Sequence, residues 1–489
     1  MAKKKEVYGP SSGSETEVEE PVLQNCAPDP ERSKSAKSKR DNEEAEIEAR
    51  EAGEDHARET KKPKLASIFT KRAVNKPSAA SGKQVSASGA LVWKEPLGEE
   101  GSCLHGTFGI PTEGSGDGGS KMAVKSYVAA FDLDGTLIRP LKGKTFPNPK
   151  DEYDFEFVFP TVVEKLRKEH QAGATIIIVS NQKQSRTSAK GGLETWKKKL
   201  GHITEAIGVP IRVFAALAHD SFRKPALGSW HAFLELKEQG IEVDMSKSFY
   251  VGDAAGRKGS GRRVKDHSDG DLKWALNAGL RFYTPEHYFL GKEAPLPTPE
   301  RHWLGEEEPS EPFYHPSDTP LVRADGAQEV VLFVGPPASG KTSLYKRYFE
   351  KDDYVWVNQD TLKSRDKCVK AVEKAIDEGK SCVVDNTNRD KATRKVYIDL
   401  ARKKGVKIRC FHFNLTRERC IHNNLFRAFG AGPRDEPRRE LVPTMAIDSF
   451  FKTLQTPEEV EGFDEEPKVI RWRFDGDEEV RRRYEMYYS

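Results

Sequence analysis

The sequence predicts two α/β domains of the Rossmann-like, three-layer type behind a disordered N-terminal arm. Short β-branched runs alternate with helical stretches from residue 127 to 282 and again from residue 329, as in parallel sheets covered by helices. An acidic block follows the first strand of the first series, and a glycine-rich block follows the first strand of the second. Residues 1–88 are rich in Glu, Lys, Ser and Ala and have almost no aromatic side chains, which is typical of disorder.

Length and composition favour more than one hydrophobic core. A chain of 489 residues exceeds what one core usually organises. We therefore predict a disordered arm (1–88), a first domain (89–300), a Pro- and Glu-rich linker or wrapped connection (301–325) and a second domain (326–489). The most apolar run, residues 174–179, is far too short to cross a bilayer, so we expect no membrane contact.

Charge and cysteine usage give weaker signals. The formal net charge of +3 conceals basic clusters at 34–40, 61–64, 258–265 and 481–483. The cluster at 61–64 resembles a nuclear-import patch, although an ordinary solvated charge run explains it equally well. The six cysteines show no C-x-x-C spacing, so neither a zinc site nor a disulfide framework is indicated, and a reducing compartment is expected.

Two aspartates follow the first predicted strand (127–131). Asp132 and Asp134 belong to a D-x-D-G-T block at the carboxyl end of a parallel strand, where such sheets bind ligands. One carboxylate can attack a phosphate if a metal ion reduces their repulsion, and the other can protonate the leaving alkoxide. The alternative is that the pair only caps a turn, because Asp-Gly is a common turn dipeptide.

Further polar side chains follow the later strands of this series, which we predict at 175–179, 211–215 and 248–251. The Ser180 hydroxyl can bind phosphate oxygens, Lys224 can neutralise charge on a phosphoryl group, and Asp253 suits octahedral Mg²⁺. Taken singly, such residues are more often turn or surface groups. Their order at successive strand ends favours a phosphate site.

A glycine-rich block follows the first strand of the second series, which we predict at 329–334. Residues 335–342 have the pattern G-x-x-x-x-G-K-T. The backbone N–H groups of such a loop can encircle phosphates, its lysine can reach the outer phosphates, and its threonine, Thr342, can supply an oxygen to Mg²⁺. The alternative is a structural glycine-rich start of a helix. The residues expected to bind the phosphates of a nucleoside triphosphate are Gly335, Ser339, Gly340, Lys341, Thr342 and Ser343.

Polar groups also follow the next two strands, predicted at 354–357 and 381–384, before a last strand at 407–413. Asp360 can accept a proton from an attacking hydroxyl, and residues 385–388 add polar groups at the same edge. Helix N-capping is the alternative for both segments. Arg427 lies one turn beyond residues 423 and 424 on a predicted helix, where it is either a lid arginine over the triphosphate or an exposed side chain.

The strand-end order of the first domain resembles the haloacid dehalogenase phosphatase superfamily. That resemblance implies that Asp132 forms an aspartyl-phosphate and that Asp134 acts first as an acid and then as a base. It also implies that Ser180 and Lys224 hold the phosphate and that Asp253 helps to bind Mg²⁺, with Asp132 and Asp134 as further metal-site residues. The sequence leaves open which of the downstream acids supports the metal: Asp266, Asp269 or Asp271.

The phosphatase-then-kinase order resembles the eukaryotic polynucleotide kinase 3′-phosphatase family from about residue 93 to the C-terminus. The matching stretches are 131–138, 222–225, 251–257, the glycine-rich loop at 335–342 (the P-loop), 357–358 with 360–362, 385–388 and 422–424. The stretch V-G-D-A-A-G-R at 251–257 is much more specific than D-x-D-G-T. The resemblance implies hydrolysis of 3′-phosphate ends and ATP-dependent phosphorylation of 5′-hydroxyl ends in DNA repair. Two features depart from it: the polar arm replaces a forkhead-associated domain, and Gln359 replaces an arginine.

The implied partners are DNA strand-break ends, with RNA ends left open, and a DNA ligase or repair scaffold. A nuclear monomer is expected. The basic loop with Lys258, Arg262, Arg263 and Lys265 is expected either to contact backbone phosphates or to be solvated. Two other functions are a small-molecule phosphatase fused to a metabolite kinase and a non-catalytic nucleotide-binding scaffold. The acids and lysines that the chemistry needs are all present, which speaks against the scaffold.

Overall fold

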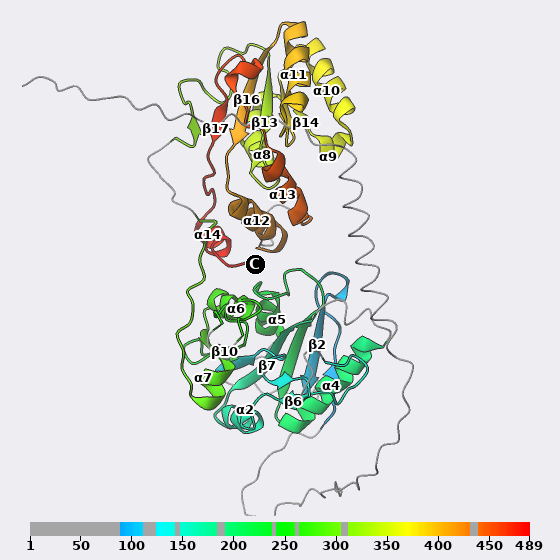
Figure 1. Cartoon of the computed structure of the whole chain (residues 1–489), viewed down its shortest axis with the longest axis vertical. Coiled ribbons are helices and arrows are strands. Elements are labelled where there is room, and N and C mark those ends of the chain that lie inside the picture. The colour runs from blue at the N-terminus through cyan, green and yellow to red at the C-terminus, as the bar shows by residue number, and fades with distance from the viewer. Residues whose placement is uncertain are drawn as a thin grey trace, which may run out of the picture. The chain divides into compact units, whose positions relative to one another are not determined.

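The computed structural model describes residues 89–110, 124–141, 147–182, 191–236, 241–259, 264–304, 312–430 and 439–489. These residues contain two large, mostly parallel sheets, each covered by helices, which confirms the predicted fold class (Figure 1). The predicted arm, the basic cluster at 61–64, and Arg262 and Arg263 of the basic loop lie outside the described residues. Within the described part, no helix combines the length and the apolar character needed to cross a membrane.

The first sheet has seven strands in the order β1-β2-β8-β7-β4-β10-β11. Strands β8, β7, β4, β10 and β11 are parallel, and β2 and β1 continue the sheet antiparallel at one edge. The four predicted strands are β4, β7, β8 and β10, with ends shifted by one or two residues. The bounds are β1 Val92–Trp93, β2 Cys103–Phe108, β4 Val128–Phe131, β7 Thr175–Asn181, β8 Ile211–Ala216, β10 Phe249–Val251 and β11 Arg281–Tyr283.

Alternate side chains of β4 fill two hydrophobic cores. Ala129 and Phe131 pack with α2 (Val162–Gln171) and α4 (Gly192–Ile207), whereas Val128 and Ala130 pack with α5 (Gly228–Leu236) and α6 (Gly270–Ala278). All four side chains are buried, as expected for a parallel strand covered on both faces. Both cores therefore fix the carboxyl ends of the central strands. Smaller elements are β3 Val124–Ser126, β5 Ile138–Arg139, β6 Glu156–Phe157, β9 Ile241–Val243, η1 Glu99–Gly101 and α7 Pro285–Leu290.

The second sheet has six strands in the order β12-β17-β16-β13-β15-β14. All neighbours are parallel except β12, which pairs antiparallel with β17. The four predicted strands correspond to β13, β14, β15 and β16, with ends that differ by at most one residue. The bounds are β12 Tyr314–His315, β13 Glu329–Val334, β14 Val355–Val357, β15 Cys382–Asp385, β16 Lys407–Phe413 and β17 Lys468–Ile470.

Strand β13 separates the two cores of this sheet. Val330 and Leu332 pack with α10 (Arg365–Asp377) and α11 (Lys391–Lys404), and Val331 and Phe333 face the other core. Because β13 is central and buried, the glycine-rich loop that follows it lies at the middle of the sheet's carboxyl edge. The remaining helices of this domain are α8 Lys341–Leu344, η2 Tyr345–Phe349, η3 Glu350–Asp352, α9 Gln359–Leu362, α12 Arg417–Leu425, η4 Phe426–Gly430, α13 Thr444–Thr453, η5 Glu459–Glu461 and α14 Glu478–Tyr484.

Part of the predicted linker, residues 301–325, belongs to this second sheet. Strand β12 lies within it, and Leu321 is buried in the core with Val331 and Phe333. The Arg409 guanidinium pairs with Glu329 and also donates to the carbonyl oxygens of residues 320 and 321 at 2.9 and 2.7 Å. In the described part of this segment, residues 314–321 therefore pack on the second sheet.

Two candidate phosphate sites

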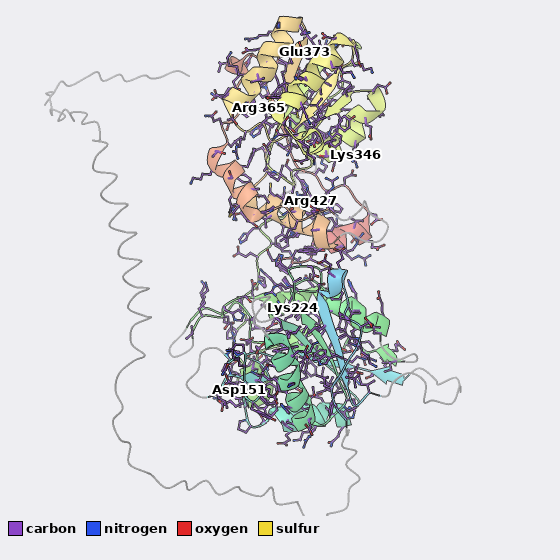
Figure 2. All side chains as sticks on the ribbon, turned by 90° about the vertical axis from the view of Figure 1, so that its right-hand side faces the viewer. Asp151, Lys224, Lys346, Arg365, Glu373 and Arg427 are labelled. Atoms are coloured by element: carbon purple, nitrogen blue, oxygen red, sulfur yellow. The ribbon has the colours of Figure 1, made fainter. Side chains whose placement is uncertain are left out.

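Lys224 lies buried at the carboxyl edge of the first sheet (Figure 2). Its ammonium group donates to Oδ1 of Asp132 and Oδ1 of Asp271, both at 2.7 Å, and to the Tyr250 hydroxyl at 2.8 Å. The Asn181 side-chain amide fixes the Lys224 backbone, because it accepts from the Lys224 N–H at 2.9 Å and donates to its carbonyl oxygen at 3.1 Å. Burial alone would lower the pKa of Lys224, but the two carboxylates outweigh it and raise that pKa to about 12.

Three acidic side chains meet beside this lysine. Ligand oxygens of Asp132, Asp253 and Asp271 lie within 4.8 Å of one another, the single such acidic group in the described ranges. Burial raises the pKa of Asp132 to about 7, against the lowering effect of Lys224, and burial together with the neighbouring carboxylates raises that of Asp253 to about 8. The negative charges of the three carboxylates repel one another, and a bound divalent cation would reduce this repulsion. Because Mg²⁺ prefers oxygen ligands, the acidic group fits Mg²⁺.

Two glycines allow these acids to approach so closely. A Cβ atom on Gly135, whose φ is +89°, would lie 2.4 Å from Oδ2 of Asp253. A Cβ atom on Gly252 would lie 2.5 Å from the side chain of Asp271. Any larger residue at either position would push a carboxylate out of the group.

The three downstream acids have different surroundings. Asp271, in the first turn of α6, belongs to the acidic group, and its Oδ2 accepts from the Ala254 N–H at 3.0 Å. Asp266 instead pairs with the Arg257 guanidinium at 2.7 Å, and Asp269 pairs with Lys273 at 2.8 Å. Of the three candidates that the sequence left open, Asp271 is therefore the one placed to support a metal ion.

Asp134 and Ser180 lie at the same edge but outside this acidic group. The Gln182 side-chain amide donates to Oδ2 of Asp134 and to the Ser180 hydroxyl, both at 2.9 Å. Ser180 and Gln182 are each 2% exposed. The structure thus joins both predicted residues through Gln182, which was not among the predicted site residues. The Asp134 charge also acts to raise the pKa of Asp132.

In the second domain the glycine-rich loop wraps around its own lysine. The Lys341 ammonium donates to the carbonyl oxygens of Gly335 and Pro336 at 3.0 and 2.6 Å. Burial lowers the pKa of Lys341 to about 8. Gly335 must be a glycine because a Cβ atom there would lie 2.7 Å from Phe413. The Lys341 ammonium group also donates to the Ser339 hydroxyl at 3.4 Å, so it contacts both ends of the loop.

Thr342 contacts an aspartate that the sequence analysis did not include among the metal ligands. Its hydroxyl donates to Oδ2 of Asp385 at 2.6 Å, and the Trp356 indole N–H donates to the same oxygen at 3.0 Å. Asp385 ends β15, which pairs with β13, and it is 2% exposed. A hydroxyl and a carboxylate beside a phosphate loop fit Mg²⁺. The signal was present in the sequence, because this acid directly follows an apolar run.

Asp360 is exposed in the first turn of α9. Asn358 caps this helix, since its side-chain oxygen accepts from the Thr361 N–H at 3.2 Å, and the Asn386 side chain accepts from the Gln359 N–H at 2.7 Å. The capping alternative is therefore right for Asn358 and does not apply to Asp360. The Asp360 charge acts to raise the pKa of Lys341. The Asp360 carboxylate is therefore close enough to the phosphate loop to interact with its lysine.

Arg427 lies in η4 beside the same loop (Figure 2). Its guanidinium donates to Oδ1 of Asn424 at 3.0 Å, and the Asn423 side chain donates to the carbonyl oxygen of Ala338 in the loop at 3.0 Å. Burial lowers the pKa of Arg427. Arg427 and residues 338–343 line one cavity of about 1000 Å³. Arg427 is therefore half-buried beside the loop, which excludes the alternative of a fully exposed side chain, and its role as a lid arginine stays a prediction.

Two sheets, one ending in a buried Asp–Lys site and the other in a P-loop, define an enzyme with separate phosphatase and kinase sites. Residues 127–289 match the family described as polynucleotide kinase 3 phosphatase, and residues 330–457 match a family described as an AAA domain. The bifunctional polynucleotide phosphatase/kinase of Schizosaccharomyces pombe is 37% identical over 355 residues, covering 71% of this chain and 79% of that protein. The polynucleotide 3′-phosphatase ZDP of Arabidopsis thaliana is 35% identical over 184 residues, 33% of this chain and 24% of that protein. The chain belongs to the bifunctional polynucleotide phosphatase/kinase family.

Proposed function

We propose that this chain repairs DNA strand-break ends by removing 3′-phosphates in its first domain and phosphorylating 5′-hydroxyls from ATP in its second. The observation that carries the proposal is the presence of two phosphate sites on two different sheets, each with its own cation and its own oxygen ligands for Mg²⁺. A strand break with a 3′-phosphate and a 5′-hydroxyl needs both reactions, and one chain keeps both activities near the same lesion.

In the proposed phosphatase reaction, a carboxylate oxygen of Asp132 attacks phosphorus and the bond to the 3′-oxygen breaks. Asp134 gives a proton to the leaving 3′-oxygen and then takes one from the water that releases inorganic phosphate from Asp132. Lys224 and Ser180 hold the phosphoryl oxygens. Asp132, Asp253 and Asp271 would hold Mg²⁺, which when bound neutralises negative charge between the acids and the phosphate.

In the proposed kinase reaction, Asp360 accepts the proton of the 5′-hydroxyl as its oxygen attacks the γ-phosphorus of ATP and ADP leaves. Lys341 and Arg427 stabilise the charge on the transferred group. Thr342 and Asp385 would hold Mg²⁺, which when bound neutralises charge on the phosphates. The residues proposed to contact the phosphates through the loop are Gly335, Ser339, Gly340 and Ser343.

Asp271→Asn tests the metal site of the first domain. We expect the Mg²⁺ concentration for half-maximal 3′-phosphate release to rise about tenfold to a hundredfold, because one charged ligand of the group is lost. Asp269→Asn, two residues away and paired with Lys273, is the matched control and should leave this requirement unchanged. Equal Mg²⁺ requirements of wild type and Asp271→Asn would remove Asp271 from the site.

Location and partners form a further part of the proposal. A substrate at DNA breaks favours action in the nucleus, where we propose that the chain works as a monomer with a DNA ligase or repair scaffold. Fluorescence microscopy of the tagged full chain, compared with a chain whose 61–64 cluster is replaced by alanines, checks the location.

The first domain is proposed to span 89–300, and the second to include β12 in addition to residues 326–489.

A further inference from the structure

Tyr250 is a buried tyrosine to which the proposed phosphatase reaction gives no role. It lies in β10, its side chain is 0% exposed, and its ring lies 4.6 Å from that of Trp274 in the hydrophobic core. Its hydroxyl nevertheless reaches the polar carboxyl edge of the sheet, where it accepts from the Lys224 ammonium group at 2.8 Å and donates to Oδ1 of Asp271 at 3.0 Å. Phenylalanine would fill the same space in the core, so the hydroxyl is what distinguishes tyrosine here.

The Lys224 ammonium group has more acceptors around it than protons to give. Its nitrogen lies 2.7 Å from Oδ1 of Asp132 and 2.7 Å from Oδ1 of Asp271. It also lies 2.8 Å from the Val179 carbonyl oxygen and 2.8 Å from the Tyr250 hydroxyl. An ammonium group has three N–H donors, so these four acceptors leave none for a phosphoryl oxygen. A phosphate that Lys224 binds must therefore take an N–H from one of them.

The Tyr250 hydroxyl reaches two of the acceptors that Lys224 uses. It lies 3.0 Å from Oδ1 of Asp271 and 3.4 Å from the Val179 carbonyl oxygen, and its one proton goes to the closer oxygen. Oδ2 of Asp271 accepts from the Ala254 N–H at 3.0 Å. If Lys224 turns away from Asp271, each oxygen of this carboxylate therefore still accepts a hydrogen bond. This matters because Asp271 is 2% exposed, and a buried charge without hydrogen bonds is costly.

We propose that Tyr250 is a positioning residue of the phosphatase reaction, whose hydroxyl keeps Asp271 hydrogen-bonded when an N–H of Lys224 turns to the phosphoryl group. The inference rests on the proposed phosphatase function and adds a residue to its site. Lys224 can then contact the phosphate while Asp271 keeps its place in the acidic group that fits Mg²⁺. Tyr250 thus acts through Lys224 and Asp271, and it is assigned no contact with the substrate.

The change Tyr250→Phe keeps the ring and removes only the hydroxyl. Orthovanadate, a tetrahedral oxyanion like phosphate, is used with Mg²⁺ and the full chain to inhibit the release of phosphate from a 3′-phosphorylated oligonucleotide. We expect the inhibition constant of orthovanadate to rise about tenfold, because an N–H that Lys224 gives to the oxyanion then leaves Asp271 short of one hydrogen bond. Tyr127→Phe, which removes a hydroxyl that donates to Glu169 at 2.7 Å, is the matched control and should be inhibited like wild type.

Cation binding in the absence of an oxyanion is the second measurement, and it does not depend on turnover. Titration with Mn²⁺ is followed by the electron paramagnetic resonance signal of the free ion, and the binding that Asp271→Asn loses identifies the site of the first domain. We expect Tyr250→Phe to bind Mn²⁺ at this site with wild-type affinity, because Lys224 still donates to Asp271 when no oxyanion is present. A hydroxyl that only stabilised the fold would not separate the two affinities.

Circular dichroism, the melting temperature and 5′-phosphorylation at the wild-type rate show that Tyr250→Phe is folded. Unchanged inhibition by orthovanadate in this folded variant would overturn the proposal. Weaker Mn²⁺ binding in the absence of orthovanadate would overturn it as well, since the hydroxyl would then hold Asp271 at all times. A wild-type chain that released no phosphate from the oligonucleotide would instead overturn the proposed phosphatase function.

Discussion

Asp132→Asn is expected to lower the rate of phosphate release from a 3′-phosphorylated oligonucleotide by about 10⁴-fold or more, as removal of a nucleophile does in other enzymes. The amide is nearly the same size as the carboxylate but cannot form the acyl-phosphate bond. Phosphorylation of a 5′-hydroxyl oligonucleotide by the same preparation should stay at the wild-type rate, because Lys341 and Asp385 lie at the carboxyl edge of the other sheet. Both reactions are followed with end-labelled oligonucleotides.

Folding of the Asp132→Asn protein can be checked independently. The far-ultraviolet circular dichroism and the melting temperature of Asp132→Asn show whether it is folded, because the change also removes a carboxylate that pairs with buried Lys224. Glu164→Gln, an exposed substitution on α2, is the control for the loss of a carboxylate. Loss of both reactions in a folded Asp132→Asn protein would contradict two independent sites, and retained phosphate release would exclude Asp132 as the nucleophile.

The central strands of both sheets were predictable because they are buried on both faces. Strand β7 (Thr175–Asn181) and strand β13 (Glu329–Val334) are nearly continuous apolar runs, which the sequence displays directly. The strands β1, β12 and β17 are only two or three residues long, and the edge strand β12 pairs with β17, which is far away in the sequence. No local pattern marks such strands. This is why a strand of the second sheet lay within the predicted linker.

The site residues at strand ends were predictable because the buried strands before them were predictable. The positions of the remaining site residues depend on how the helices pack against the sheet. Asp132 follows β4 directly and Asp253 comes two residues after β10, so the sheet determines where both lie. Asp271 competes with Asp266 and Asp269 within six residues, and only the approach of α6 to Gly252 shows which carboxylate joins the group.

Two features of the second domain depend on contacts between distant parts of the chain, which the local sequence does not display. Asp385 is the last residue of β15, but the sequence suggested only polar or helix-capping groups for its segment. Its contact with Thr342 depends on the pairing of β15 with β13. The cavity beside the P-loop gave no signal in the sequence. Its walls come from Phe313, Tyr348 and Phe474, which lie far apart in the chain and meet only in the folded domain.

Lys341→Ala is expected to lower 5′-phosphorylation by about 10³-fold, with 3′-phosphate release unchanged. The magnitude follows from losing a buried charge that stabilises the transferred phosphoryl group. Lys351→Ala, on exposed η3, is the control for the loss of a lysine. Parallel loss of phosphate release in a folded Lys341→Ala protein would show that the two sites are not independent.

The pH dependence of ATP binding shows whether the positive charge of Lys341, rather than the packing of its side chain, contributes to the affinity. Burial lowers the pKa of Lys341 to about 8, so the ammonium form that attracts phosphate is present below that pH and is lost as the pH rises through it. The affinity of the wild type for ATP should therefore fall between about pH 7 and pH 9. The affinity of Lys341→Ala should fall less over the same range, because this variant has no ammonium group at that position. The same slope in both proteins would mean that another group governs the titration. A flat profile in the wild type would mean that bound phosphates hold the proton on Lys341 across this range, and the lysine would then contribute a constant charge.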